Sequence, residues 1–141
     1  MPLNLLLTRL YRTLKNNKTF LVYFPLIIYW LIIFTLTTVP TEAPQLFDFQ
    51  DKVEHFIAYF VLGSLLTLAL HFQKKIPSIT KRTFLIALIL IFIYGAIDEI
   101  HQYFIPGRDC DFFDWLADIL GGSAGVVIIS RFVNKFKDSG A

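Results

Sequence analysis

Apolar residues gather in four long runs that are separated by short polar segments. A helix that spans a bilayer needs about 20 predominantly apolar residues, and each run approaches that length once its flanking residues are included. The pattern therefore predicts an all-α fold built as a bundle of four transmembrane helices. The predicted helices cover about residues 20–38, 52–71, 83–104 and 112–133.

The first 19 residues form a basic segment that differs from the four runs. Its leucines recur on one face of a helix, and its charged residues are all Lys or Arg. A helix with this pattern lies in the membrane interface with its apolar face toward lipid. We therefore expect a short amphipathic N-terminal helix within residues 1–19, a membrane domain at 20–134 and a cytoplasmic tail at 135–141.

The segments that flank the runs alternate in charge, and this order separates a membrane bundle from a soluble one. Their net charge is positive before the first run, negative after it, positive at residues 72–82, negative at 105–111 and positive at the C-terminal end. Cytoplasmic loops of membrane proteins are enriched in Lys and Arg, whereas a soluble helical bundle has no reason to alternate in this way. Four spans with both termini in the cytoplasm place every positive segment on the cytoplasmic side and every negative segment on the outer side.

Composition agrees with this topology and narrows the function classes. Hydrophobic residues make up 55% of the chain and charged residues 17%, against roughly 25% charged in an average soluble protein. The basic residues fall in short separate patches without interleaved stacking aromatics, so no nucleic-acid partner is expected. The single cysteine, Cys110, cannot form an internal disulfide.

A polar cluster stands at the end of the third run, where residues 98–102 read Asp-Glu-Ile-His-Gln. Ionisable groups inside a membrane segment are costly and by default suggest a functional site. In the predicted topology the second helix begins, the third ends and the fourth begins at the same outer face. We therefore expect the polar residues of three helices to line one outward-facing cup, with Arg108 of the connecting hairpin beside it.

Helical spacing indicates which side chains of the second and third helices point the same way. At about 100° per residue, Asp51, His55 and Tyr59 share one face of the second helix. Asp98 and Gln102 share one face of the third. We expect each of these two sets to line one side of the cup.

The fourth helix shows most clearly which face packs inward. Asp114, Asp118, Gly121 and Gly125 lie on one face, and two glycines four residues apart let helix backbones approach closely in lipid. The face that carries the aspartates should therefore pack against the bundle. A charge as deep as Asp118 needs a partner there.

Three of these residues also have simpler interpretations. Asp51 would cap the second helix, because Asp is favoured at helix starts and suits the positive end of the helix dipole. His101 would face the lipid headgroups at the interface. Arg108 would pair with Asp109 or Asp111 within the hairpin.

Four short motifs follow one another in a defined order: Asp-Lys-x-x-His from Asp51, Glu-x-x-Gln from Glu99, Pro-Gly-Arg ending at Arg108, and Asp-x-x-x-Asp-x-x-Gly from Asp114. Together they resemble the VanZ-like family of bacterial integral membrane proteins over the last three helices. Many members of that family carry Asn where this chain has Asp118. The binding positions implied by the resemblance are Asp51, Lys52, His55, Tyr59, Glu99, Gln102, Arg108, Asp114 and Asp118.

The resemblance also implies a location and a biological setting. It points to a multi-pass protein of the bacterial plasma membrane and cell envelope, with a link to resistance to the lipoglycopeptide antibiotic teicoplanin. The partners it suggests are membrane lipids, a lipid-linked cell-wall precursor or the lipoglycopeptide itself.

The first functional hypothesis is a non-enzymatic protein that binds a lipid headgroup or a lipid-linked cell-wall component. In this hypothesis Arg108 and Lys52 hold phosphate or carboxylate. Glu99, Gln102 and Asp114 accept hydrogen bonds from hydroxyl or amine groups. The outward-facing cup is then a ligand-binding site without turnover.

The alternative hypotheses assign catalysis, metal binding or proton transport to the same polar residues. A membrane enzyme would use His55 as the base, with Asp51 or Glu99 orienting the imidazole, although the cup offers no obvious Ser or Cys nucleophile. His and carboxylates also bind Zn²⁺ or Mg²⁺, but a His-x-x-x-His or Cys pair is missing, so no metal and no cofactor are expected. Proton-coupled transport through only four helices would require a homo-oligomer.

Overall fold

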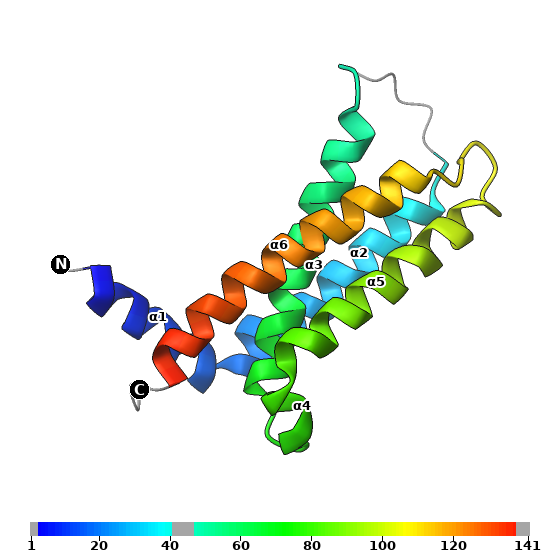
Figure 1. Ribbon diagram of the computed structural model, residues 1–141. Coiled ribbons are helices and arrows are strands. Elements are labelled where there is room, and N and C mark those ends of the chain that lie inside the picture. The colour runs from blue at the N-terminus through cyan, green and yellow to red at the C-terminus, as the bar shows by residue number, and fades with distance from the viewer. Residues whose placement is uncertain (1–2, 41–46, 138–141) are drawn as a thin grey trace.

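The computed structural model describes residues 3–40 and 47–137, and these are helical over most of their length (Figure 1). No strand occurs among the described residues, which confirms the predicted all-α class. The elements are α1 (Leu3–Asn16), η1 (Thr19–Tyr23), α2 (Phe24–Thr38), α3 (Gln50–Phe72), α4 (Pro77–Lys81), α5 (Thr83–Gln102) and α6 (Phe112–Lys137).

Four helices of the described chain are long and apolar enough to cross a membrane. They are the continuous Thr19–Thr38 segment, α3, α5 and residues 112–136 of α6, so the predicted number of spans is confirmed. Their ends differ slightly from the prediction. α5 stops at Gln102 rather than at residue 104, and α6 continues to Lys137 rather than ending at residue 133.

The first span begins with the π-helical turn η1, which runs directly into α2. The N–H of Phe24 bonds to the carbonyl of Thr19. Pro25, the next residue, has no N–H to donate to the preceding turn, and a wider turn is a common adjustment at such a point. The span therefore stays helical in spite of its proline.

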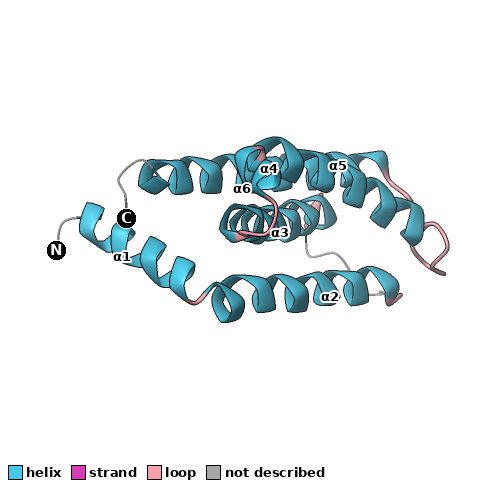
Figure 2. Ribbon diagram, turned by 90° about the horizontal axis from the view of Figure 1, so that it is seen from below, coloured by secondary structure: helices cyan, strands magenta, loops and turns pink. Residues whose placement is uncertain are grey.

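α3 lies at the centre of the bundle. Figure 2 shows it between α2 on one side and α5 and α6 on the other, and its most extensive contacts are with α6. Side-chain atoms added at Gly121 and Gly125 would run into the backbone carbonyls of Phe56 and Phe60 on α3. The prediction that this face of the fourth helix packs inward is therefore confirmed.

The interior contains two clusters of buried apolar side chains. The central cluster joins α2, α3, α5 and α6 through residues such as Ile33, Tyr59 and Ile91. The second cluster lies at the end where α1 meets the bundle, and in it Tyr11 packs on Phe72 of α3 and Phe136 of α6. Apolar contacts thus position the four helices below the polar end of the bundle.

The predicted N-terminal segment contains the helix α1 and contacts α6. A cavity of about 400 Å³ beside it is lined by side chains that include Lys15, Lys18, Lys74 and Lys81. The membrane-surface position of α1 and the cytoplasmic location of both termini stay predictions. The last four residues of the predicted tail lie outside the described part of the chain.

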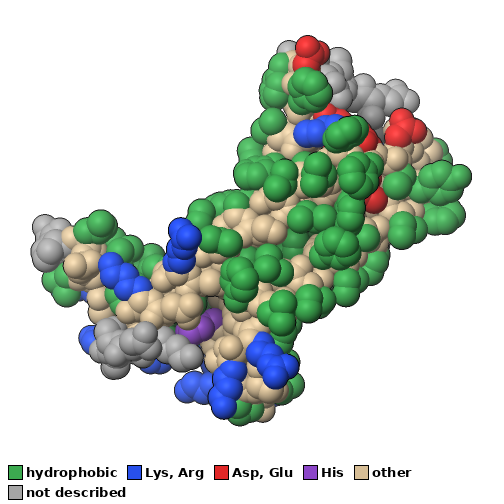
Figure 3. Space-filling view, in the orientation of Figure 1, with side chains coloured by type: hydrophobic (Ala, Val, Ile, Leu, Met, Phe, Trp, Pro, Cys, Tyr) green, Lys and Arg blue, Asp and Glu red, His purple; other side chains and the backbone are tan. Residues whose placement is uncertain are grey.

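Charged side chains separate toward the two ends of the molecule. Figure 3 shows Asp and Glu side chains near the end where α6 begins and most visible Lys and Arg side chains near the end that carries α1 and α4. Hydrophobic side chains cover much of the face between them. This is the surface expected of a bundle whose middle contacts lipid.

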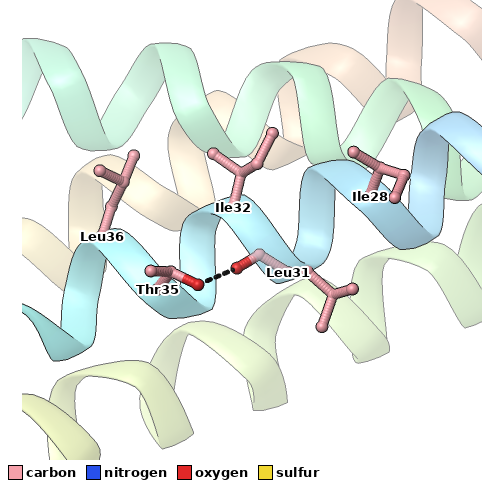
Figure 4. A pocket seen from close by; sticks show the side chains of 5 residues that line it. All are labelled: Ile28, Leu31, Ile32, Thr35 and Leu36. Atoms are coloured by element: carbon pink, nitrogen blue, oxygen red, sulfur yellow. Dashed lines mark hydrogen bonds between the residues drawn. The ribbon is translucent and has the colours of Figure 1, made fainter.

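The lipid-facing surface also contains a shallow apolar groove along α2. Ile28, Leu31, Ile32, Thr35 and Leu36 line a space of about 340 Å³ (Figure 4). The only side-chain hydroxyl among them, that of Thr35, donates to the carbonyl of Leu31 at 2.8 Å. The groove thus presents mainly aliphatic surface and no charged group.

Candidate functional site

The polar side chains at one end of the bundle form two layers. We call Asp51, Lys52, Asp111 and Asp114 the mouth cluster and His55, Glu99 and Asp118 the floor cluster. The side chains of Asp51 and Asp111 are 39% and 36% exposed, whereas those of Glu99 and Asp118 are 5% and 0% exposed. The polar residues predicted on three helices therefore lie together at one end of the bundle, and their burial increases from the mouth cluster to the floor cluster.

Lys52 organises the mouth cluster. Its Nζ atom lies 2.8 Å from Asp51 Oδ2 and 2.8 Å from Asp114 Oδ1, and it also donates a hydrogen bond to Asp111. A single ammonium thus joins α3, α6 and the hairpin that precedes α6. Since its donors have acceptors, Lys52 has little capacity left for a phosphate or carboxylate of a ligand.

Asp111 has a larger role than the sequence suggested. It directly precedes α6, and its carboxylate accepts the N–H of Phe113 at 2.8 Å, as an N-cap residue does. The hydrogen bond from Lys52, together with this N–H, holds the pKa of Asp111 below its ordinary value. An Asp immediately before a predicted helix was the signal that could have identified it.

Asp51 lies in the first turn of α3, but it does not occupy the capping position. The N-cap residue is Phe49, which adopts a left-handed backbone conformation with φ of 64°. The carboxylate of Asp51 instead pairs with Lys52. Asp51 therefore contributes charge to the mouth of the cup.

The floor cluster brings together one residue from each of three helices. His55 Nδ1 on α3 lies 2.9 Å from Asp118 Oδ1 on α6 and 4.0 Å from Glu99 Oε1 on α5. The partner that orients His55 is thus Asp118. The sequence had suggested Asp51 or Glu99 for this role.

Glu99 is held in place from the hairpin side. Its Oε2 accepts the backbone N–H of Asp111 at 3.0 Å, and the Nε2 of Gln102 lies 3.5 Å from its Oε1. Oε1 therefore keeps most of its capacity to bind another donor or a cation. Gln102 lies on the same face and is itself buried.

A third buried acid, Asp98, directly precedes Glu99 on α5. Its Oδ2 accepts the hydroxyl of Tyr59 at 3.1 Å. Tyr59 also stacks on Tyr94, with ring centroids 6.0 Å apart. Tyr59 is therefore a structural partner of Asp98, and it is almost fully buried.

Two residues lie differently from what their positions in the sequence suggested. Arg108 donates from its Nη2 to the carbonyls of Leu36, at 2.6 Å, and Val39, at 3.2 Å, at the end of α2. It thus joins the hairpin to α2. The ring of His101 stacks on Phe34 at 5.2 Å, which places it against α2.

The balance of charge in the cup is acidic. Among the described residues of this end, three carboxylates contact Lys52, two contact His55, and a further buried acid, Asp98, accepts a hydrogen bond from Tyr59. Arg108 is engaged with backbone carbonyls instead. The arrangement therefore favours groups that carry positive charge or donate hydrogen bonds over further anions.

A family model described as VanZ/LLP1 matches residues 1–133 of this chain. The match includes every residue of the two clusters and extends beyond the last three helices to the N-terminal segment. No curated protein and no solved structure shows a significant match. The four membrane-capable helices and this match together identify a multi-pass membrane protein.

Proposed function

This chain belongs to the VanZ/LLP1 family, and we propose that it binds the polar head of a lipid or of a lipid-linked cell-wall component in the cup. The cup would face outward from the bacterial plasma membrane. The observation that carries the proposal is the mouth cluster, in which Lys52 is surrounded by Asp51, Asp111 and Asp114 at the more exposed end of the polar side chains.

The charges of the cup indicate which part of the ligand enters it. Lys52 and Arg108 already have carboxylate or carbonyl acceptors, so the cup has acceptors to spare and few free donors. An ammonium or hydroxyl group of the ligand would donate to Asp114, Glu99 and the side-chain oxygen of Gln102. The phosphate of the same ligand would then stay at the rim.

Headgroup binding is tested with the purified chain in detergent. Native mass spectrometry would compare a lipid that carries an ammonium headgroup, phosphatidylethanolamine, with phosphatidylglycerol, which carries only hydroxyls and phosphate. We expect saturable binding with preference for the ammonium lipid. Asp114→Asn should weaken this binding, while the exposed Asp48→Asn serves as the matched control. Equal retention of both lipids by both variants would contradict the proposal.

A second candidate function is a membrane enzyme that acts on the same class of ligand. The specific observation in its favour is the 2.9 Å contact between His55 and Asp118, because a carboxylate that orients an imidazole is the arrangement of a general base. Turnover of a purified lipid or lipid-linked precursor that His55→Ala abolishes, with binding retained, would favour this candidate. Saturable binding without turnover would favour the first.

The family link suggests a biological readout. We propose that ligand binding in the cup underlies an effect on teicoplanin susceptibility, with membrane lipids and a lipid-linked precursor as the partners. A comparison of lipids and muropeptides from cells with and without the protein would identify the molecule whose level changes. The same experiment would show whether the protein acts on membrane lipids or on the lipid-linked precursor.

A further inference from the structure

We infer that the floor cluster is a metal site, in which His55, Glu99 and Asp118 bind one divalent transition-metal ion such as Zn²⁺ or Mn²⁺. The inference goes beyond headgroup binding and does not rest on it. It concerns the buried floor cluster, which shares Glu99 with the proposed headgroup contacts, whereas those contacts begin at the mouth cluster.

The geometry supplies three ligand atoms around one point. One nitrogen of His55 and one carboxylate oxygen each from Glu99 and Asp118 lie within 4.8 Å of one another. Bonds of about 2.0–2.2 Å from Zn²⁺ to nitrogen and oxygen place ligand atoms roughly 3–4 Å apart. The contacts of 2.9 Å and 4.0 Å made by His55 Nδ1 fall near this range, so small side-chain rotations suffice to bring the three atoms around an ion.

The charge of the floor cluster calls for a cation. Glu99, Asp118 and the neighbouring Asp98 are all buried, and the one cationic partner among the contacts of this layer is His55. Buried carboxylates without enough positive charge are strongly unfavourable. A divalent ion offsets two of these charges, which a lone imidazolium cannot do.

Lys52 cannot fill this role for the floor cluster. Its Nζ is surrounded by Asp51, Asp111 and Asp114 of the mouth cluster. No contact links Lys52 to Glu99 or Asp118 among the contacts of the described chain. Lys52 therefore supplies no direct counter-charge to the floor cluster.

A buried polar atom without a partner provides an independent observation. Asp118 is fully buried, and its Oδ2 has no hydrogen-bond partner in the described structure. Such an atom is expensive in an interior. Oδ1 already contacts His55, so Oδ2 is the oxygen of Asp118 that a bound ion would provide with a partner.

The surroundings also hold the ligands in position. Glu99 Oε2 accepts the N–H of Asp111 at 3.0 Å, which leaves Oε1 directed to the cluster. Hydrogen bonds of this kind orient metal ligands and raise affinity. Three protein ligands leave at least one coordination position open, and that position could take water or an oxygen of a bound molecule.

The ligand types indicate the class of metal. An imidazole suits Zn²⁺ and other first-row ions, whereas Mg²⁺ and Ca²⁺ prefer sites made only of oxygen. One imidazole with two carboxylates therefore favours a first-row divalent ion over the alkaline-earth ions. The exposed Cys110 lies in the hairpin and is not part of the floor cluster.

The test measures metal binding without added lipid. The full-length protein in detergent is stripped with EDTA and titrated with ZnCl₂ or MnCl₂, and the bound metal is quantified by equilibrium dialysis and elemental analysis. We expect one ion per chain. Glu99→Gln and Asp118→Asn should weaken binding by at least about tenfold, because even residues that only orient a ligand change affinity by about 10- to 100-fold.

A matched control variant tests whether an effect on metal binding is specific to the acids of the floor cluster. Glu54→Gln alters an acid whose side chain contacts Gln50 at the helix start, and it should bind metal as the unmodified protein does. Metal affinity that is unchanged in Glu99→Gln and Asp118→Asn would overturn the inference, as would a stripped wild-type protein that binds no ion.

A second measurement covers the case in which the variants do not fold, as judged by circular dichroism. Co²⁺ added to the stripped wild-type protein should give visible absorption bands that Zn²⁺ removes at one equivalent. Absence of these bands would overturn the inference. Because no lipid is present, headgroup binding can fail while this result stands, and the reverse also holds.

Discussion

His55 Nδ1 on α3 lies 2.9 Å from Asp118 Oδ1 on α6, and Asp118 is fully buried. This contact joins the two helices that pack most extensively against each other. It forms on the same face of α6 as Gly121 and Gly125, whose lack of side chains lets α3 approach. Close backbone packing thus brings the imidazole and the carboxylate together.

Removal of the Asp118 carboxylate should lower the stability of the folded protein. In Asp118→Ala the His55 ring loses its acceptor in a largely buried place, which costs about 1–3 kcal/mol. Asp118→Asn keeps an amide oxygen that accepts the same hydrogen bond, so its loss should be smaller. Thermal unfolding in detergent, followed by circular dichroism, measures both. Equal melting temperatures for Asp118→Ala and the unmodified protein would contradict this prediction.

A methyl group at Gly121 should separate α3 from α6. The added Cβ of Gly121→Ala would meet the backbone carbonyl of Phe56, which moves only if the helix moves. Overpacking of this kind costs about 1–3 kcal/mol. Leu120→Val, at a neighbouring exposed position, is the control and should change the melting temperature little. If both variants melt alike, the close approach of the helices does not matter for stability.

Stability should depend on pH through Asp111. Lys52 and the Phe113 N–H lower the pKa of Asp111 in the folded protein, so the ionised side chain stabilises the fold above its ordinary pKa of about 3.9. This contribution disappears as the pH falls through the lowered value. Asp111→Asn should therefore be less stable than the unmodified protein at neutral pH, and the difference should close in acid.

The effect of Asp111 will be small, since its side chain is 36% exposed and solvent screens its ion pair. Asp109→Asn, an exposed acid of the same hairpin, is the matched control. Melting temperatures measured from pH 7 to pH 3 give the comparison. A difference for Asp111→Asn that grows in acid has the wrong sign for this explanation.

Arg108 should matter for the end of α2 more than for ligand binding. Arg108→Ala removes the donor to the carbonyls of Leu36 and Val39, and a cation at a helix C-terminus contributes up to about 1 kcal/mol. We expect faster amide exchange in the last turn of α2 and the hairpin, with insertion into the membrane retained. Arg12→Ala on α1 should leave both regions unchanged. Loss of headgroup binding without faster exchange would instead assign Arg108 to the ligand.

Glu99 should be required for activity in cells. Glu99→Gln keeps the shape of the side chain but removes its charge from the floor cluster, so it should abolish any change in teicoplanin susceptibility that the wild-type protein confers. Glu54→Gln is the control for loss of one acid on the same end of the bundle. Immunoblots of membrane fractions would verify insertion. Wild-type behaviour of Glu99→Gln would mean that the cup is only structural.

Several features of the site were predictable because they depend on local spacing. Asp114 and Asp118 lie on the face of a helix that also carries two glycines, and the period of the helix alone directs all four toward the bundle. The polar end of α5 was equally evident, since Glu99 and Gln102 follow an uncharged run. The metal-ligand set had no such signal, because its three residues come from three different helices.

The number of spans, the alternation of charge between them and the residues that share each helical face could all be predicted from the amino-acid sequence. Those properties follow from composition and from a fixed helical period. The contacts of His55 with Asp118, of Lys52 with Asp111 and of Arg108 with the end of α2 could be seen only in the folded molecule. Such pairs depend on the rotation and depth of one helix relative to another, which are decided by packing between residues far apart in the chain.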